Sequence, residues 1–237
     1  MGIASPSSAA GAASAKYRKF SAPRIAAEDG DFARAYLATG LVPLGKTLLS
    51  EFGFSASAEH PRLGPVRNPW HTEHTAGASS SGSAAFVAAG VVPIAHANDG
   101  GGSIRIPAAC NGLVGLKPTR GRLPLDANMR QMPLHIVHNG VVTRSVRDTA
   151  AFCREMERVQ RNPRLPAIGD VTGPSANRLR IAVCTRSIAR EASPEVTELT
   201  HKTAAVLERL GHHVTAIENP VPERFMDDFL LYWSFRA

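Results

Sequence analysis

The stretch from Gly77 to Gly121 reads GASSSGSAAFVAAGVVPIAHANDGGGSIRIPAACNGLVGLKPTRG and contains two unusual runs, SSSGS at 79–83 and DGGGSIR at 99–105. Three consecutive glycines are unfavourable inside a helix or strand, because glycine loses the most backbone freedom on folding. They are typical of a sharp turn whose backbone N–H groups approach another group. A serine directly after them, Ser103, stands where a nucleophile beside an oxyanion-binding turn would lie.

Outward from this stretch, helical and strand patterns alternate along most of the chain. The apolar spacing and the Gly and Pro signals predict helices at 31–39, 81–90, 104–111, 147–159, 194–210 and 225–235, and strands at 41–44, 91–97, 113–116, 179–184 and 214–217. We read 55–76 and 118–133 as loops and 160–177 as a linker. This alternation predicts an α/β fold with a mixed or parallel central sheet flanked by helices.

The N-terminal segment differs in composition from the rest. Residues 1–15 are rich in Ala, Ser and Gly and have no amphipathic period. We therefore expect a poorly ordered segment at 1–30 and a domain at 31–237. The segment lacks the basic start and leucine-rich stretch of a signal peptide, and no window has the apolar length of a membrane span, so we predict a cytoplasmic protein without membrane contact.

Charge and cysteine usage limit the partners. The chain has a net charge of +7, but the basic residues are scattered, so nucleic-acid binding is not favoured. The three cysteines form no zinc spacing and are predicted to be small buried hydrophobes. His71 and His74 lack a further ligand, and His96 reads as a strand histidine. We expect no metal site and no cofactor, and the sequence leaves a homodimer open.

Several separated motifs resemble the amidase signature family of serine hydrolases. They are GASSSGS at 77–83, DGGGSIRIPA at 99–108, GLKPTRGR at 115–122, GKT at 45–47 and GPVRNPW at 64–70. Within the family, the runs HANDGGGSIRIPA and GLKPTRGRLPL look most like the branch that contains 6-aminohexanoate cyclic dimer hydrolase. The resemblance implies the amidase signature fold and hydrolysis of a carboxamide, a small molecule such as an ω-amino acid amide, through a serine acyl-enzyme.

The resemblance also implies roles for individual residues. Ser103 matches the nucleophile, and Ser79 matches the bridging serine beside a cis peptide bond, which relays the proton towards a lysine. The backbone N–H groups of Gly100, Gly101, Gly102 and Ser103 match the oxyanion donors, and Ser80 supports them by hydrogen bonding. Asp99 and Arg105 flank the turn with opposite charges, and we interpret them as bracing it.

The family's lysine has no counterpart at the matching distance before Ser79. Lys16 and Lys19 lie in a polar stretch, and Lys46 belongs to the GKT motif, so we expect structural or solvated roles for all three. The family domain is about twice as long, so the resemblance implies a chain truncated at both ends. Two alternatives to an amidase therefore stay open: an inactive fragment or degenerate paralogue, and a glutamine amidotransferase A-type subunit acting on charged transfer RNA.

Overall fold

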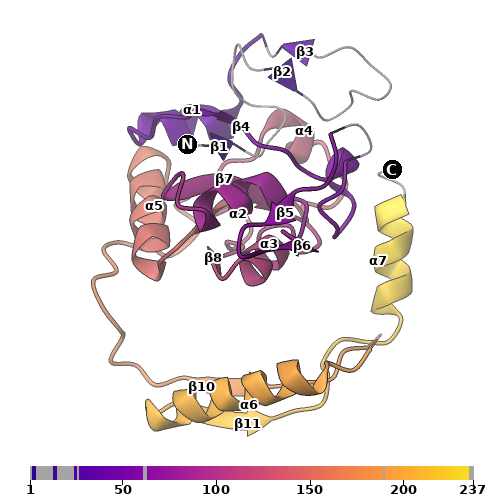
Figure 1. The fold of residues 1–237 in the computed structure, drawn as a ribbon. Coiled ribbons are helices and arrows are strands. Elements are labelled where there is room, and N and C mark those ends of the chain that lie inside the picture. Colours follow the sequence, from indigo (N-terminus) through magenta and orange to yellow (C-terminus); the bar gives the residue numbers. More distant parts are fainter. Residues whose placement is uncertain are drawn as a thin grey trace. The chain divides into compact units, whose positions relative to one another are not determined.

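The computed structural model describes residues 27–60, 63–188 and 190–234, and the backbone of three two-residue strands before them (Figure 1). The chain forms two compact units, residues 1–172 and 173–237, and each is described by itself. Most of the segment 1–30, expected to be poorly ordered, lies outside the described residues. A single domain at 31–237 stays a prediction.

Unit 1 is built on a five-stranded mixed sheet with strand order β4-β1-β7-β9-β8. Its first three strands are parallel to one another, and β9 is antiparallel to β7 and β8. These strands are β1 (Gly2–Ile3), β4 (Gly45–Lys46), β7 (Ile94–Asp99), β8 (Val114–Gly115) and β9 (His138–Thr143). The mixed sheet with flanking helices confirms the predicted α/β fold class.

The remaining elements of unit 1 are short, except for helix α5 (Val146–Val159) with its 14 residues. Two antiparallel ribbons pair β2 (Ala13–Ser14) with β3 (Arg24–Ile25) and β5 (Arg67–Asn68) with β6 (His71–Thr75). The helices are α1 (Asp31–Ala38), the 3₁₀ turn η1 (Glu51–Gly53), α2 (Ser81–Ala88), α3 (Arg105–Cys110), α4 (Ala127–Arg130) and α5 (Val146–Val159).

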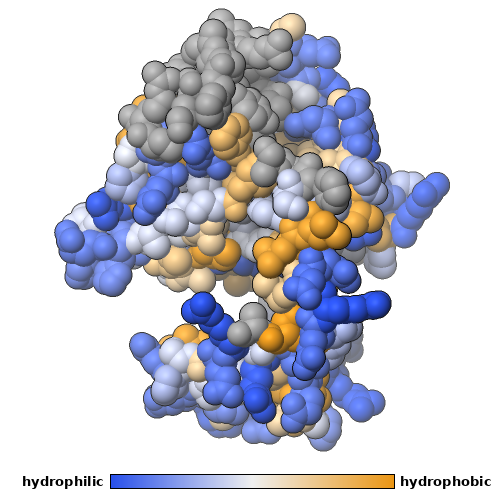
Figure 2. Space-filling model, turned by 90° about the vertical axis from the view of Figure 1, so that its right-hand side faces the viewer, coloured by the Kyte–Doolittle hydropathy of each residue, from blue (hydrophilic) through white to orange (hydrophobic). Residues whose placement is uncertain are grey.

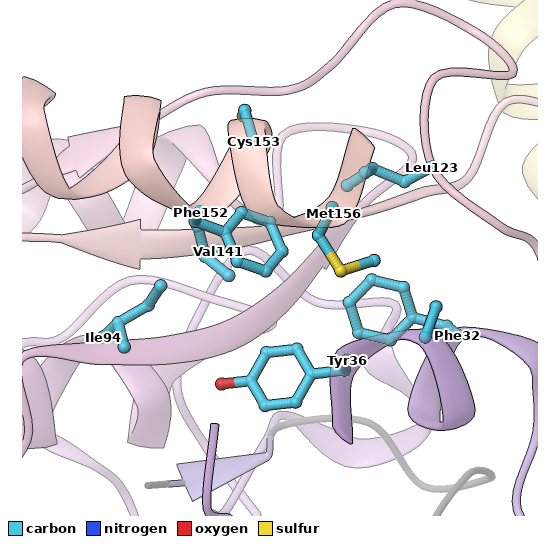
Figure 3. Packing of buried hydrophobic residues seen from close by; sticks show 9 residues of the cluster. Phe32, Tyr36, Ile94, Leu123, Val141, Phe152, Cys153 and Met156 are labelled. Carbon is cyan, nitrogen blue, oxygen red and sulfur yellow. The ribbon is translucent and has the colours of Figure 1, made fainter. Parts of the chain in front are cut away.

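Strand β7 separates two hydrophobic cores, because successive side chains of a strand point to opposite faces. On one face, Ile94 packs with residues of α1 and α5. Figure 3 shows Phe32 and Tyr36 of α1 meeting Phe152 and Met156 of α5. On the other face lie the small side chains of β7 with α2 and α3, in a core of Val87, Val92, Ala95, Ala97, Ile104, Ala108 and Val142.

The second core needs glycine where helix α3 meets the sheet. A Cβ on Gly140 of β9 would lie 2.7 Å from Ile104 Cδ1, and one on Gly115 of β8 would lie 2.5 Å from Ala108 Cβ. Both distances are shorter than side chains tolerate. The absence of a side chain at these two positions therefore lets α3 lie close against β8 and β9.

Helix α1 takes its N-terminal cap from a distant part of the chain. Its own cap residue, Gly30, has no side chain, and the N–H of Phe32 instead donates to Asp126 Oδ1 at 3.1 Å. The Asp126 side chain is buried, and burial raises the pKa of its carboxyl. Asp126 thus satisfies one of the free N–H groups that every helix start presents.

Four expectations from the sequence were wrong in unit 1. Residues 41–44 are not a buried strand, since Val42 and Leu44 are 70% and 74% exposed, and the strand is the next pair, Gly45–Lys46. The predicted loop 55–76 contains the β5–β6 ribbon, and the predicted loop 118–133 contains helix α4. Strand β9 was missed, because its Asn139-Gly140 pair resembles a turn signal, although tertiary contact explains the glycine.

Unit 2 has almost no core of its own. It contains β10 (Arg180–Val183) parallel to β11 (His213–Ala216), with helices α6 (Pro194–Arg209) and α7 (Phe225–Ser234). These elements confirm the predicted order. No described residue of unit 2 is buried, and a cavity of about 410 Å³ is lined by residues of β10, α6 and β11. Figure 2 shows its apolar side chains reaching the surface.

Neither unit offers a membrane-spanning helix: within the described residues, every helix is too short or too polar to cross a bilayer.

The contrast between α5 and α6 predicts different local stability. Helix α5 buries Phe152, Cys153 and Met156, whereas α6 buries no residue. Because protection from hydrogen exchange follows buried apolar contact, amides of α5 should exchange at least about tenfold more slowly than those of α6. Exchange followed by mass spectrometry on the two helices measures this ratio. Equal protection would contradict the difference in packing.

The raised pKa of the Asp126 carboxyl leads to a second prediction, which concerns the stability of the fold. A carboxyl whose folded-state pKa is raised binds its proton more tightly when folded, so stability falls as the pH rises through that value. Asp126→Asn keeps an acceptor for the Phe32 N–H without a buried charge, and should match or exceed the wild type in urea at pH 7. Asp126→Ala removes the cap and should lose about 1 kcal/mol. Equal losses in both variants would contradict a capping role.

Candidate active site

The turn after β7 is wrapped around one buried carboxylate. Asp99 Oδ1 accepts the N–H of Gly102 at 2.8 Å, and Asp99 Oδ2 accepts the N–H of Ile104 at 3.2 Å. The Arg105 guanidinium binds both oxygens, from Nε at 2.9 Å and from Nη2 at 2.8 Å. The prediction that Asp99 and Arg105 brace the turn is confirmed.

This network keeps the carboxylate charged. Burial by itself would raise the pKa of Asp99, whose side chain has no exposed surface. The hydrogen bonds from Arg105 and from the Ile104 N–H outweigh burial, and the pKa lies below its usual value. The turn is therefore organised by a fixed negative charge beneath it.

The glycines of the turn divide into two kinds. Gly102 has φ +129°, and a Cβ there would lie 2.7 Å from Ile106 Cδ1, so only glycine fits. Its N–H is directed inward to Asp99. Among the described residues, the N–H groups of Gly100, Gly101 and Ser103 have no hydrogen-bond partner. Gly101 is exposed, and Gly100 and Ser103 are half-buried.

The serine run lies beside this turn. The peptide bond between Ala78 and Ser79 is cis, as the resemblance implied, and Ser79 and Ser80 are both buried. Ser80 Oγ accepts the N–H of Asn98 at 3.4 Å and donates to the Asn98 carbonyl at 3.5 Å. The structure therefore brings the serine segment against the last residues of β7, immediately before Asp99.

Helix α2 continues the serine run and is held from two sides. A Cβ on Gly82 would lie 2.6 Å from the Leu48 carbonyl oxygen, so the helix start contacts the backbone after β4. Ser83 Oγ donates to the His96 carbonyl at 2.7 Å and lies 3.1 Å from Thr47 Oγ1. The GKT motif thus anchors α2 through its threonine.

The 3₁₀ turn η1 covers Ser79. A Cβ placed on Gly53 would lie 3.5 Å from Ser79 Oγ. The preceding residue, Phe52, has φ +53°, a conformation that non-glycine residues rarely adopt. This turn precedes the segment 55–76 that was predicted to be a loop.

None of the lysines in the described residues can be assigned as the base that would accept the proton relayed through Ser79. Lys16 and Lys19 lie outside the described residues. Lys117 Nζ donates to the Pro118 carbonyl, and Lys202 pairs with Glu198 on α6. Lys46 and His96 both lie opposite Ile3 in the sheet register, so Lys46 is on the face where His96 meets Phe32 of α1, not on the face covered by α2. Burial lowers the pKa of Lys46.

The histidines behave as structural groups. His96 is fully buried with Nε2 at 3.1 Å from Asn139 Oδ1, and burial lowers its pKa to about 4. His71 and His74 lie on the exposed strand β6 with ring centroids 4.6 Å apart. Within the described residues, no group of three His, Cys, Asp or Glu side chains is placed to hold a metal ion.

The cysteines followed the sequence prediction only in part. Cys153 is buried and Cys184 is partly buried, but Cys110 is exposed at the end of α3. That correction has a simple cause: Ala109 and Cys110 lie on the outer side of a six-residue helix whose Pro107 and Ala108 face inward.

Solved structures of known proteins superpose on this fold. A bacterial aryl acylamidase of the amidase signature family superposes with a TM-score of 0.78 and 28% identity, covering 95% of this chain and 49% of that chain. 6-Aminohexanoate cyclic dimer hydrolase gives a TM-score of 0.65 at 33% identity, covering 81% of this chain and 42% of that one. The amidase fold is thereby shown.

The sequence comparisons agree. The amidase family model matches residues 10–237. A Mycobacterium leprae protein named AmiC, described as a candidate amidase, is 72% identical over 216 residues, which cover 91% of this chain and 46% of that protein. The chain belongs to the amidase signature family. It spans about half the length of the curated relatives it matches.

The Asp99 network predicts the behaviour of Arg105 variants. Arg105→Met removes two hydrogen bonds to a buried charge and should lower the free energy of unfolding by on the order of 2 kcal/mol. Because the pKa of Asp99 is depressed in the folded state, this contribution is present above its unfolded value, near 3.9, and is lost as the pH falls through the lower folded value.

Urea unfolding at pH 7 and at pH 3 measures this contribution. Arg147→Met, on a side chain that is 88% exposed, is the matched control and should have little effect at either pH. A loss in Arg105→Met that is equally large at both pH values would contradict the interpretation.

Proposed function

We propose that the chain carries the nucleophile half of an amidase site, with Ser103 as the nucleophile. The observation that carries this proposal is the turn at Asp99, in which the N–H groups of Gly100 and Gly101, just before the half-buried Ser103, have no hydrogen-bond partner among the described residues. Family membership adds the reaction class, hydrolysis of a carboxamide in a small molecule.

In the proposed reaction, Ser103 Oγ attacks the carbonyl carbon of the amide. The C–N bond breaks, an ester to Ser103 forms, and the proton from Ser103 reaches the leaving nitrogen through Ser79. Water then hydrolyses the ester and returns the proton. The base that completes the relay, a lysine in the family, is not assigned to a residue of this chain, and the proposed steps need no metal or organic cofactor.

The oxyanion site has fewer N–H donors than the sequence suggested. Four donors were expected, but the Gly102 N–H is bound to Asp99. The proposal therefore assigns the oxyanion to the N–H groups of Gly100, Gly101 and Ser103, each worth roughly 3 kcal/mol in the transition state. Gly102 and Ser80 act indirectly, by shaping the turn and by tying the serine segment to Asn98.

Labelling with a fluorophosphonate, which reacts with activated serines, tests the proposal. Intact mass should show one adduct on the wild type and none on Ser103→Ala. Ser79→Ala should label at least about 10²-fold more slowly, because it loses the proton relay. Ser175→Ala, which changes an exposed serine of unit 2, is the matched control and should label like the wild type.

Two results would count against the proposal. An adduct that persists in Ser103→Ala would place the nucleophile elsewhere. A wild-type chain that is folded by circular dichroism but takes no label would favour the alternative, a member of the family without catalysis.

A further inference from the structure

Helix α3 connects the two serine segments of the proposed site. It begins at Arg105, two residues after Ser103, and its start is fixed by the Arg105 pairing with Asp99. Its end, at Cys110 and Asn111, lies beside the segment that leads into Ser79. A short helix held at both ends fixes the separation of whatever its ends contact.

The contact at the far end is made by the Asn111 side chain, which is fully buried. Its Nδ2 donates to the Ala76 carbonyl at 2.8 Å and to the Pro107 carbonyl at 2.8 Å. Both acceptors are carbonyls, so the amide must present its two N–H groups to them. One bond stays within α3, and the other reaches the backbone two residues before the cis bond at Ala78.

Packing supports this bond. A Cβ on Gly77 would lie 2.9 Å from Pro107 Cα and 3.0 Å from Cys110 Sγ, so the serine segment touches α3 directly. Because Gly77 follows Ala76 directly, a shift of the Ala76 carbonyl would move Gly77 and the peptide bond between Ala78 and Ser79 with it. The segment is therefore held by Asn111 on one side and by the Ser80–Asn98 contact on the other.

The β5–β6 ribbon holds the end of α3 from outside. Asn68 Nδ2 donates to the Cys110 carbonyl at 2.6 Å, and Trp70 Nε1 donates to the Asn111 carbonyl at 2.9 Å. These are the carbonyls that a helix end leaves without intrahelical partners. Because both are occupied, the backbone of Asn111 is fixed while its side chain reaches Ala76.

We propose that Asn111 is a positioning residue that sets the placement of Ser79 relative to Ser103. It touches neither the substrate nor the reacting atoms, and it acts through the Ala76–Ser79 backbone. The inference rests on the proposed function for its catalytic consequence, whereas its structural part, that Asn111 orders the serine segment, stands separately.

Two measurements on Asn111→Ala test these parts. Hydrogen exchange of a peptide covering 76–81 should be at least tenfold faster than in the wild type, with exchange in β7 unchanged. Fluorophosphonate kinetics should show the maximal labelling rate of Ser103 reduced at least tenfold, with the half-saturating label concentration unchanged, because misplaced reacting groups lower the rate of the chemical step.

Asn162→Ala is the matched control. Asn162 Nδ2 likewise donates to a loop carbonyl, that of Gly121 at 3.0 Å, in the same unit. It should leave both readouts unchanged. Trp70→Phe removes the outer bond to Asn111 at a side chain that is 70% exposed, and should give smaller changes of the same sign if Asn111→Ala does not fold.

The outcomes are distinguishable. Unchanged exchange at 76–81 in both Asn111→Ala and Trp70→Phe would overturn the positioning role, as would labelling that slows only through weaker binding of the label. A wild type that takes no label would remove the proposed function and the catalytic consequence together, and the exchange result would still decide whether Asn111 orders the serine segment.

Discussion

The buried carboxylate of Asp99 is the constraint on which the candidate site depends. A charge without exposed surface is stable only when hydrogen bonds surround it, and the chain satisfies this by folding Gly102, Ile104 and Arg105 around it. This arrangement turns the backbone sharply after β7. It also directs the Gly102 N–H inward to Asp99, whereas the N–H groups of Gly100 and Gly101 have no hydrogen-bond partner among the described residues.

The rest of unit 1 brings the serine run to this turn. The small residues of β7 and the glycines of β8 and β9 allow α2 and α3 to lie close to the sheet. Hydroxyl and amide side chains then fix the loops, with Ser80 on Asn98 and Asn111 on Ala76. Unit 2, by contrast, buries none of its described residues.

Much of this could be predicted from residues alone. Apolar period and cap signals predicted helices at 31–39, 147–159 and 194–210, and the structure has helices within one residue of these bounds. The Asp99–Arg105 pair followed from opposite charges flanking a glycine run. Short strands were harder. Strand β9 was missed because Asn139-Gly140 is a turn signal in isolation. The buried strand predicted at 41–44 is not formed, because apolar residues of that segment, Val42 and Leu44, are exposed to solvent.

The sequence by itself determined the chemistry that the chain can present: the glycine turn, the serines and membership of the amidase signature family. Only the tertiary structure decided which groups are free to act. The fold of the glycine turn assigned the Gly102 N–H to Asp99, the sheet register placed Lys46 on the α1 face, and a hydrogen bond between distant segments joined Asn111 to Ala76. Such pairings depend on distances through space, which no local pattern of residues records.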